Sequence, residues 1–129
     1  EVEILLELLK DCSIPFWISY SCRQGNQTNA GQTFAEAVAI AEAAMAVGIN
    51  CTAPEFITDL LRSANSKKTY VVYPNSGRVW DAAKKEWIGS SESGFDAKLI
   101  KQWQDCGAEF IGGCCGIGAA EIEQLTLSR

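Results

Sequence analysis

The stretch AVGINCTAPEF, residues 46–56, decides the fold class, because it joins an apolar strand directly to the start of a helix. Residues 46–49 form a short apolar run of the kind found in buried strands. Residues 52–55, with the sequence TAPE, have the pattern of a capping box that carries proline in the first helical turn, where its missing N–H costs nothing. The stretch therefore predicts one βα unit, with Cys51 at the carboxyl end of its strand.

The rest of the chain repeats this alternation of strand and helix. A helix is predicted over residues 1–10, and apolar runs predict three further strands, at residues 16–20, 70–73 and 109–111. Apolar residues at three- and four-residue steps predict helices over residues 34–45, 56–61, 95–106 and 119–127. The two longest remaining segments are interpreted as a polar loop, residues 21–32, and an irregular segment with a functional role, residues 75–94. Strands that each precede a helix predict an α/β fold with a parallel sheet and right-handed crossovers.

Two parallel architectures are compatible with this order of elements. A small open sheet with helices on both faces would be complete in 129 residues. A (β/α)8 barrel needs about 250 residues, so four βα units would make up half of one. Both architectures place their functional groups at the carboxyl ends of the strands, and the chemistry is therefore expected there.

Composition excludes several classes of function. Hydrophobic residues make up 47% of the chain and charged residues 21%, which is ordinary for one globular domain. With a net charge of −5, the chain lacks the basic excess expected of a protein that binds nucleic acid or an anionic membrane. Its longest apolar stretch, residues 43–49, is too short to span a bilayer. Because the chain contains no histidine, Ser-His-Asp and Cys-His catalysis and two-histidine zinc motifs are excluded within it. The six cysteines are too sparse for a disulfide scaffold, so we expect reduced thiols and a cytoplasmic location.

Three of the six cysteines follow predicted strands at the end where function is expected. Cys51 follows the second strand, and Cys114 and Cys115 follow the fourth, within the glycine-rich sequence GGCCGIG. Zinc accepts thiolates readily, and catalytic zinc sites commonly use three protein ligands with the fourth position open. Three thiolates would leave such a site with a formal charge of −1, which would keep a fourth, substrate thiolate nucleophilic. A zinc site is therefore one interpretation of these residues.

The spacing alone leaves alternatives open. GGCCGIG could instead cradle a phosphate on its backbone N–H groups, as loops near the last strands of barrels often do. Adjacent Cys114 and Cys115 could also form a vicinal disulfide, or could be small residues in a tight turn. Cys22, just past the first strand, could compete as a ligand, whereas Cys12 and Cys106 are interpreted as structural thiols.

Three ordered motifs carry a resemblance to a known family. They are GINCTAP at residues 48–54, VYPNSG at residues 72–77 followed by VWD at residues 79–81, and GGCCG at residues 112–116. Together they closely resemble the homocysteine S-methyltransferase family, especially the members that use S-methylmethionine. The sequences FWIS at residues 16–19 and FAEAV at residues 34–38 also fit that family. The resemblance extends over essentially the whole chain.

The resemblance implies both a fold and a reaction. Members of the family are (β/α)8 barrels, and residues 1–129 resemble the C-terminal half of such a barrel, strands five to eight. The cysteines that hold zinc in the family correspond to Cys51, Cys114 and Cys115. In the implied reaction, homocysteine binds zinc as a thiolate and attacks the methyl group of a sulfonium donor, giving methionine. The leaving group departs as a neutral thioether, so no histidine is needed to protonate it. The resemblance therefore implies an enzyme with two small-molecule substrates.

Asn50 and Asn75, each at the end of a predicted strand, are the predicted substrate-binding residues, with hydrogen bonds expected to the substrate or to the zinc thiolates. Asparagine is equally common in turns at such positions, so a turn-forming role is the alternative. Two rivals to the enzymatic interpretation remain: a non-catalytic half-barrel or interaction module that keeps only the zinc site, and a barrel enzyme that binds phosphate on GGCCGIG. In either case, a four-stranded piece of barrel would have open sheet edges through which it could associate.

Overall fold

The computed structural model describes residues 1–89 and 96–127. Its helices are α1 (Val2–Leu9), α2 (Phe34–Ile40), α3 (Pro54–Ala64), α4 (Ala97–Asp105) and α5 (Ala119–Leu127). Its strands are β1 (Trp17–Arg23), β2 (Gln27–Thr28), β3 (Ala46–Asn50), β4 (Thr69–Tyr73), β5 (Val79–Asp81), β6 (Glu86–Ile88) and β7 (Ala108–Ile111). Within the described residues, no helix has the length and apolar character of a bilayer span.

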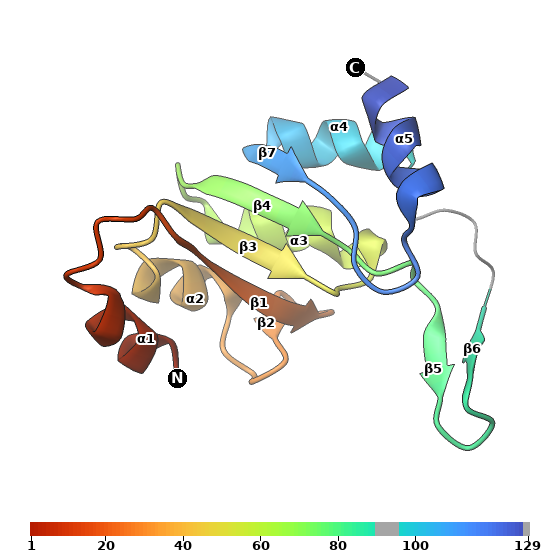
Figure 1. The fold of residues 1–129 in the computed structure, drawn as a ribbon, viewed down its shortest axis with the longest axis horizontal. Helices are drawn as coiled ribbons and strands as arrows, with labels where there is room; N and C mark the ends of the chain where they lie inside the picture. The colour runs from red at the N-terminus through yellow and green to blue at the C-terminus, as the bar shows by residue number, and fades with distance from the viewer. Residues whose placement is uncertain (90–95, 128–129) are drawn as a thin grey trace.

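The main sheet has the strand order β2-β1-β3-β4-β7, and β1, β3, β4 and β7 run parallel to one another. These four strands are neighbours in the order in which they occur along the chain, and a helix connects each to the next. Figure 1 shows these connecting helices, α2, α3 and α4, on the same face of the sheet. Strands added in sequence with all crossovers on one face form the wall of a (β/α) barrel, whereas an open doubly wound sheet places helices on both faces. The predicted α/β fold of successive βα units is confirmed.

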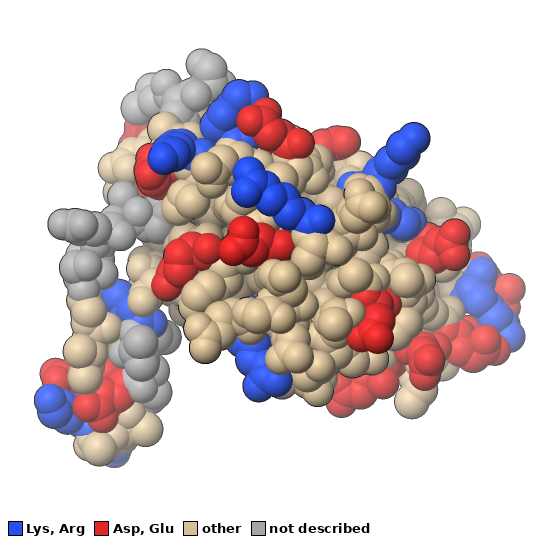
Figure 2. All heavy atoms as spheres, turned by 180° about the vertical axis from the view of Figure 1, so that it is seen from behind, with Lys and Arg blue, Asp and Glu red and all other residues tan. Residues whose placement is uncertain are grey.

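The core lies between this sheet and its helices. Alternate strand residues, including Ile18, Val47, Ile49 and Val72, are buried with apolar residues of the helices, among them Phe34, Ile57, Leu60 and Trp103. Side chains on the other face are more open, and Trp17 and Phe110 are 54% and 52% exposed. Viewed from behind, the molecule carries intermingled acidic and basic side chains over its helical side (Figure 2). The helices therefore separate a dry core from solvent, and the opposite face of the sheet is left partly uncovered.

Two predicted segments are corrected by the structure. Residues 21–32 are not simply a loop, because β1 continues to Arg23 and pairs antiparallel with β2. The turn between these strands uses left-handed backbone at Gly25 and Asn26, which polar turn residues tolerate. The helix predicted over residues 34–45 ends at Ile40, since the amide of Met45 already donates to the carbonyl of Phe16 at the start of the sheet.

Two further predictions fail for reasons of local hydrogen bonding. The predicted capping box at residues 52–55 is absent: Ala53 is the N-cap of α3, and no side chain caps it. The Thr52 hydroxyl is buried instead between two strands, where it accepts from the amide of Cys22 at 2.9 Å and donates to the carbonyl of Asn50 at 3.0 Å. The segment predicted to be irregular, residues 75–94, contains an antiparallel hairpin formed by β5 and β6. Its last residues, 90–94, lie outside the described part of the chain.

The open edges of the sheet generate a prediction about the isolated chain. β7 ends the sheet on one side, and beyond its short pairing with β2 the strand β1 ends it on the other. Because unpaired edges invite association, we expect the chain alone to dimerise, aggregate or remain partly molten. Sedimentation velocity and a thermal scan test this. A monodisperse monomer with one sharp unfolding transition would contradict it.

Candidate metal centre

Three thiols converge at the carboxyl ends of the strands. The sulfur of Cys51 lies 3.5 Å from that of Cys115, and the sulfurs of Cys114 and Cys115 lie 3.9 Å apart. All three sulfurs lie within 4.8 Å of one another. Sulfurs bound at about 2.3 Å to a tetrahedral zinc ion are separated by about 3.8 Å, so the observed spacing fits three ligands of one ion. The structure thus brings together the three cysteines that the sequence analysis selected.

Cys51 is held in place by strained backbone and by its neighbour strand. Its φ of 46° is left-handed, a conformation that costs a non-glycine residue free energy and persists only where the surroundings enforce it. Its amide donates to the carbonyl of Tyr73 at 3.0 Å, and its carbonyl accepts from Nδ2 of Asn75 at 3.1 Å. Both bonds come from the end of β4 and the turn that follows it. This region therefore determines where the Cys51 thiol points.

The loop that carries Cys114 and Cys115 is fastened to the same turn. The amide of Cys114 donates to the carbonyl of Pro74 at 2.8 Å, and the carbonyl of Cys115 accepts from the amide of Ser76 at 2.9 Å. Gly116 follows with a φ of 76°, and a Cβ placed there would lie 2.4 Å from Oγ of Ser76. Only glycine satisfies both the backbone angle and this close approach. The turn at residues 74–76 is thus the common support of both cysteine segments.

The alternative of a phosphate cradle is weakened by the same hydrogen bonds. Four amides of the loop already donate to acceptors within the protein: those of Gly112, Cys114, Ile117 and Gly118. The acceptor for Gly118 is the carboxylate of Glu121, at 2.9 Å, which would repel a phosphate. A backbone anion site needs several free N–H groups that point at the ligand. The loop therefore fits a metal held by thiols better than an anion.

The remaining cysteines stand apart from this cluster. Cys22 is buried in the core, and burial raises the pKa of its thiol to about 12. Its sulfur lies 3.6 Å from the carbonyl of Tyr20. Cys106 is half-buried at the end of α4, and Cys12 is exposed. All six cysteines are free, so the alternative of a vicinal disulfide is not what the structure shows.

The thiol cluster favours a cation for an electrostatic reason. Burial, followed by the neighbouring thiols of Cys114 and Cys115, raises the pKa of the Cys51 thiol to about 11. Crowding of like groups disfavours the thiolate, whereas a coordinated metal ion stabilises thiolates strongly enough to remove the proton. Three crowded thiols with a raised pKa are therefore a poor nucleophile by themselves and a good ligand set.

Asn50 and Asn75, the predicted substrate-binding residues, both lie next to the cluster. Nδ2 of Asn50 donates to Oγ of Ser21 at 2.8 Å, on the neighbouring strand β1. Asn75 holds the Cys51 carbonyl through Nδ2, and its Oδ1 accepts from the amide of Gly77 at 2.8 Å. These contacts give each amide a structural role. Contact with a substrate stays a prediction for both residues.

Comparison with known proteins now gives these residues a context. The sequence model of the family described as "Homocysteine S-methyltransferase" matches residues 1–127. The chain belongs to the homocysteine S-methyltransferase family. "Homocysteine S-methyltransferase 1" of Zea mays is 42% identical over 98% of this chain, and its namesake from Arabidopsis thaliana is 40% identical over 98%. The chain spans only 42% and 41% of those two relatives.

A solved structure agrees with the sequence relatives. The metallated form of the homocysteine methyltransferase MmuM from Escherichia coli matches 99% of this chain with a TM-score of 0.76 and 30% sequence identity. This chain covers 41% of that protein. The sheet of βα units described above therefore corresponds to part of a homocysteine methyltransferase structure.

Two supporting residues were not identified from the sequence. The side chain of Ser76 packs against Gly116 of the GGCCG loop. The hydroxyl of Thr52, just after β3, bonds to the amide of Cys22 in β1. The sequence VYPNSG contained a signal for Ser76, because a Pro-Asn-Ser-Gly turn directly after a strand places short polar groups at the site. For Thr52 the local pattern pointed elsewhere, since it matched a capping box. Its actual partners are distant in sequence.

Replacing the cluster cysteines tests the ligand assignment. Cys51→Ser, Cys114→Ser and Cys115→Ser should each weaken zinc binding greatly, because a hydroxyl is a poor ligand for this ion. Cys106→Ser should leave zinc affinity unchanged and cost only packing. Zinc affinity is measured by competition with a chromophoric chelator. If Cys22→Ser abolishes zinc binding while Cys51→Ser does not, the assignment is wrong.

Gly116→Ala tests whether the loop geometry matters for the metal. The added Cβ would meet Ser76 and would impose a left-handed angle on alanine, so we expect the zinc affinity to fall about tenfold to a hundredfold. Gly118→Ala is the matched control, because its Cβ would meet only the flexible carboxylate end of Glu121, at 3.3 Å. Equal zinc affinities for the two variants would contradict the proposed support.

Proposed function

We propose that this chain contributes the zinc-binding half of an enzyme that transfers a methyl group from a sulfonium donor to the thiol of homocysteine, giving methionine. The observation that carries the proposal is the convergence of Cys51, Cys114 and Cys115, with sulfur spacing suited to one tetrahedral ion. Family membership supports the choice of substrates. It also supports the assignment of residues 1–129 as the C-terminal portion of a (β/α)8 barrel.

In this proposal, Cys51, Cys114 and Cys115 would hold zinc through three thiolates. Zinc bound there would supply Lewis acidity that lowers the pKa of a coordinated homocysteine thiol, so that its sulfur is a thiolate at neutral pH. That sulfur forms a bond to the methyl carbon as the bond from carbon to the sulfonium sulfur breaks, and the donor leaves as a neutral thioether. The thiol proton passes to solvent, and no residue must protonate the leaving group.

The residues around the cluster would position rather than react. Asn75 and Tyr73 fix the backbone of Cys51, and the turn at residues 74–76 fixes the GGCCG loop, so the three sulfurs keep one arrangement. Fixed ligands make the free fourth position the place where a substrate thiol binds. Asn50 and Asn75, which lie next to the cluster, are the proposed contacts to the substrate. Reduced thiols are required throughout, which supports a cytoplasmic location.

A second candidate function is favoured by one specific observation. All three cysteines of the thiol cluster lie within this chain, which spans 42% of its maize relative and 41% of the E. coli structure. A non-catalytic zinc-binding role would need only that cluster. The two candidates differ in whether methyl transfer appears once the remainder is supplied.

Methyl transfer is tested with the chain alone and with the chain fused to the part of the maize relative that it does not cover. Formation of methionine from homocysteine and S-methylmethionine is followed by mass spectrometry. We expect activity of the fusion to exceed that of the chain alone, and Cys51→Ser in the fusion to reduce it by about a hundredfold or more. Cys106→Ser is the matched control and should retain activity. A folded, zinc-loaded fusion that forms no methionine would establish the non-catalytic alternative.

A further inference from the structure

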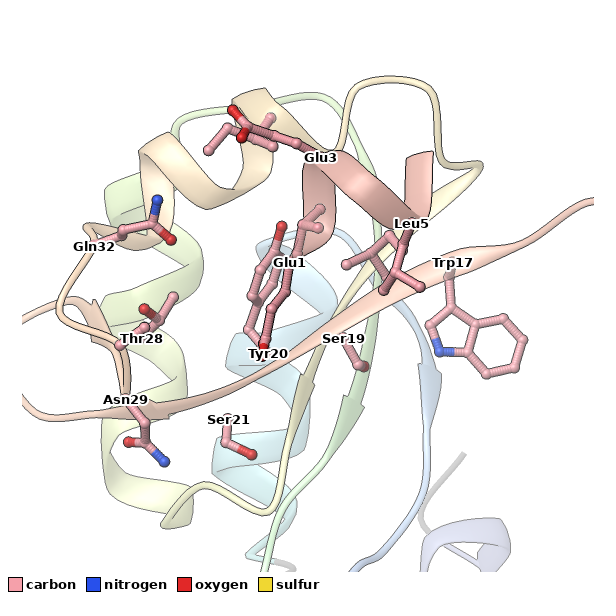
Figure 3. Close-up of a pocket in the computed structure, with 14 residues that line it drawn as sticks. Glu1, Glu3, Leu5, Trp17, Ser19, Tyr20, Ser21, Thr28, Asn29 and Gln32 are labelled. Carbon is pink, nitrogen blue, oxygen red and sulfur yellow. The ribbon is translucent and has the colours of Figure 1, made fainter. Parts of the chain in front are cut away.

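The face of the sheet turned away from the connecting helices carries a side-chain hydrogen bond that crosses a whole strand. The hydroxyl of Tyr73 in β4 donates to Oγ of Ser19 in β1 at 2.5 Å, although β3 lies between these two strands. Both side chains point away from the helices, because their sequence neighbours Ile18 and Val72 are buried in the core. Figure 3 shows Ser19 on the opposite side of β1 from Tyr20, whose hydroxyl donates to α2. The Tyr73 side chain therefore lies across β3.

Gly48 is the residue of β3 that makes this crossing possible. It pairs with Ser19 on one side and with Val71 on the other. A Cβ at Gly48 would overlap Oγ of Ser19 and would lie 3.3 Å from the carbonyl oxygen of Val71. The Ser19 hydroxyl thus occupies the space that a side chain on β3 would need, and Tyr73 meets it there. The ring of Tyr73 is fixed at both ends, by its backbone in β4 and by its hydroxyl above β3.

The backbone end of Tyr73 lies beside both cysteine segments. Its carbonyl accepts from the amide of Cys51 at 3.0 Å. Its Cβ lies 3.8 Å from the position that a Cβ would take at Gly112, two residues before Cys114. Asn50, which precedes Cys51, pairs with Tyr73 in the parallel register. The ring therefore extends from the neighbourhood of the thiol cluster toward β1, along the face of the sheet that lacks connecting helices.

The proposed reaction brings a positive charge to this region. The methyl carbon of a sulfonium donor must lie about 3–3.5 Å from the homocysteine sulfur before it is transferred. Residues 17, 19 and 21 of β1, 48 and 50 of β3, and 71 and 73 of β4 share this face, and all of them are uncharged. A carboxylate there would bind the cation but would also compete as a nucleophile for the methyl group. The face of an aromatic ring attracts a cation without reacting with it.

We propose that the ring face of Tyr73 binds the sulfonium group of the methyl donor, and that Ser19 and Gly48 hold the ring in position for it; this inference rests on the proposed function. The ring would distinguish the donor from its product. As the methyl carbon bonds to the homocysteine sulfur, the donor sulfur keeps the electron pair of the broken bond and becomes a neutral thioether, which the ring no longer attracts. Because the positive charge is already fading in the transition state, the ring contributes mainly to donor binding.

The direct test compares two ligands of the same shape and different charge. S-methylmethionine is the sulfonium ligand, and homoleucine is its neutral analogue, in which a CH group replaces the sulfonium sulfur. Their affinities are measured by calorimetry on the zinc-loaded fusion described above, without homocysteine, so that no methyl group is transferred. We expect Tyr73→Leu to lower the preference for S-methylmethionine about threefold to thirtyfold, and Tyr73→Phe to keep it within about twofold. An unchanged preference in Tyr73→Leu would overturn the proposal.

A pair of aromatic variants covers the case in which Tyr73→Leu does not fold. Tyr73→Phe is compared with a fusion that carries trifluorinated phenylalanine at position 73, which has nearly the same size. Fluorine withdraws electron density from the ring face, so the preference for S-methylmethionine over homoleucine should fall in the fluorinated protein. A purely structural role would leave this preference unchanged, because packing affects both ligands alike. Equal preferences in the two proteins would overturn the proposal.

Steady-state kinetics of the fusion give a further readout. Tyr73→Leu should raise KM for S-methylmethionine about threefold to thirtyfold and change kcat less than threefold, as expected when binding to the ground state is lost. Tyr20→Phe is the matched control, because it removes a tyrosine hydroxyl on the helix side of β1 and should leave KM unchanged. A fall in kcat with an unchanged KM would overturn the proposal.

The outcomes separate this inference from the proposed function. A fusion that forms no methionine, but loses its preference for S-methylmethionine in Tyr73→Leu, would contradict the proposed function and support the role of the ring. A fusion that forms methionine and keeps the preference in Tyr73→Leu would contradict the role of the ring alone. Equal affinities of the unaltered fusion for S-methylmethionine and homoleucine would also overturn the inference, since the protein would then not recognise the positive charge.

Discussion

The site depends on one turn, residues 74–76, which joins two segments that are distant in sequence. The carbonyls and amides of this turn bond to Thr52, Cys114 and Cys115, while Asn75 holds the carbonyl of Cys51. The cysteines come from β3 and β7, but their positions relative to each other are set by the strand between them. β4 thus sets the spacing of the thiol cluster, although it contributes no cysteine itself.

The parallel register explains how β4 sets this spacing. Asn50 pairs with Tyr73, and Val72 pairs with Ile111, so β3, β4 and β7 end at nearly the same level. After each strand the chain continues into a loop at the same edge of the sheet, where backbone N–H and C=O groups no longer pair with a neighbouring strand. Cys51, the turn after β4 and the GGCCG loop satisfy those groups with one another. Hydrogen bonds among backbone groups that have no partner in the sheet therefore hold the three cysteines close together.

Much of the fold could be predicted from the sequence because the strongest signals were local. Short apolar runs and helical periodicity located β3, β4, β7, α3 and α4, and the cysteine positions at strand ends located the thiol cluster. The features that were missed lack a local apolar pattern. Thr52 and Ser76 contact partners that lie far along the chain, and the β1–β2 hairpin is formed by backbone pairing between polar segments. Such interactions leave little trace in a window of ten residues.

The distance along the chain between the two cysteine segments has a consequence for folding. Cys51 and Cys115 are 64 residues apart, so bringing their sulfurs together closes a loop that contains α3, β4 and α4. Closing a loop of this size has an entropic cost that must be met before any long-range contact stabilises the chain. An ion held by both segments would act on the unfolded ensemble as a reversible cross-link, restricting it much as a disulfide does. Zinc binding at the proposed centre would therefore be coupled to the formation of β3, β4 and β7, and added zinc would raise the stability of the folded chain.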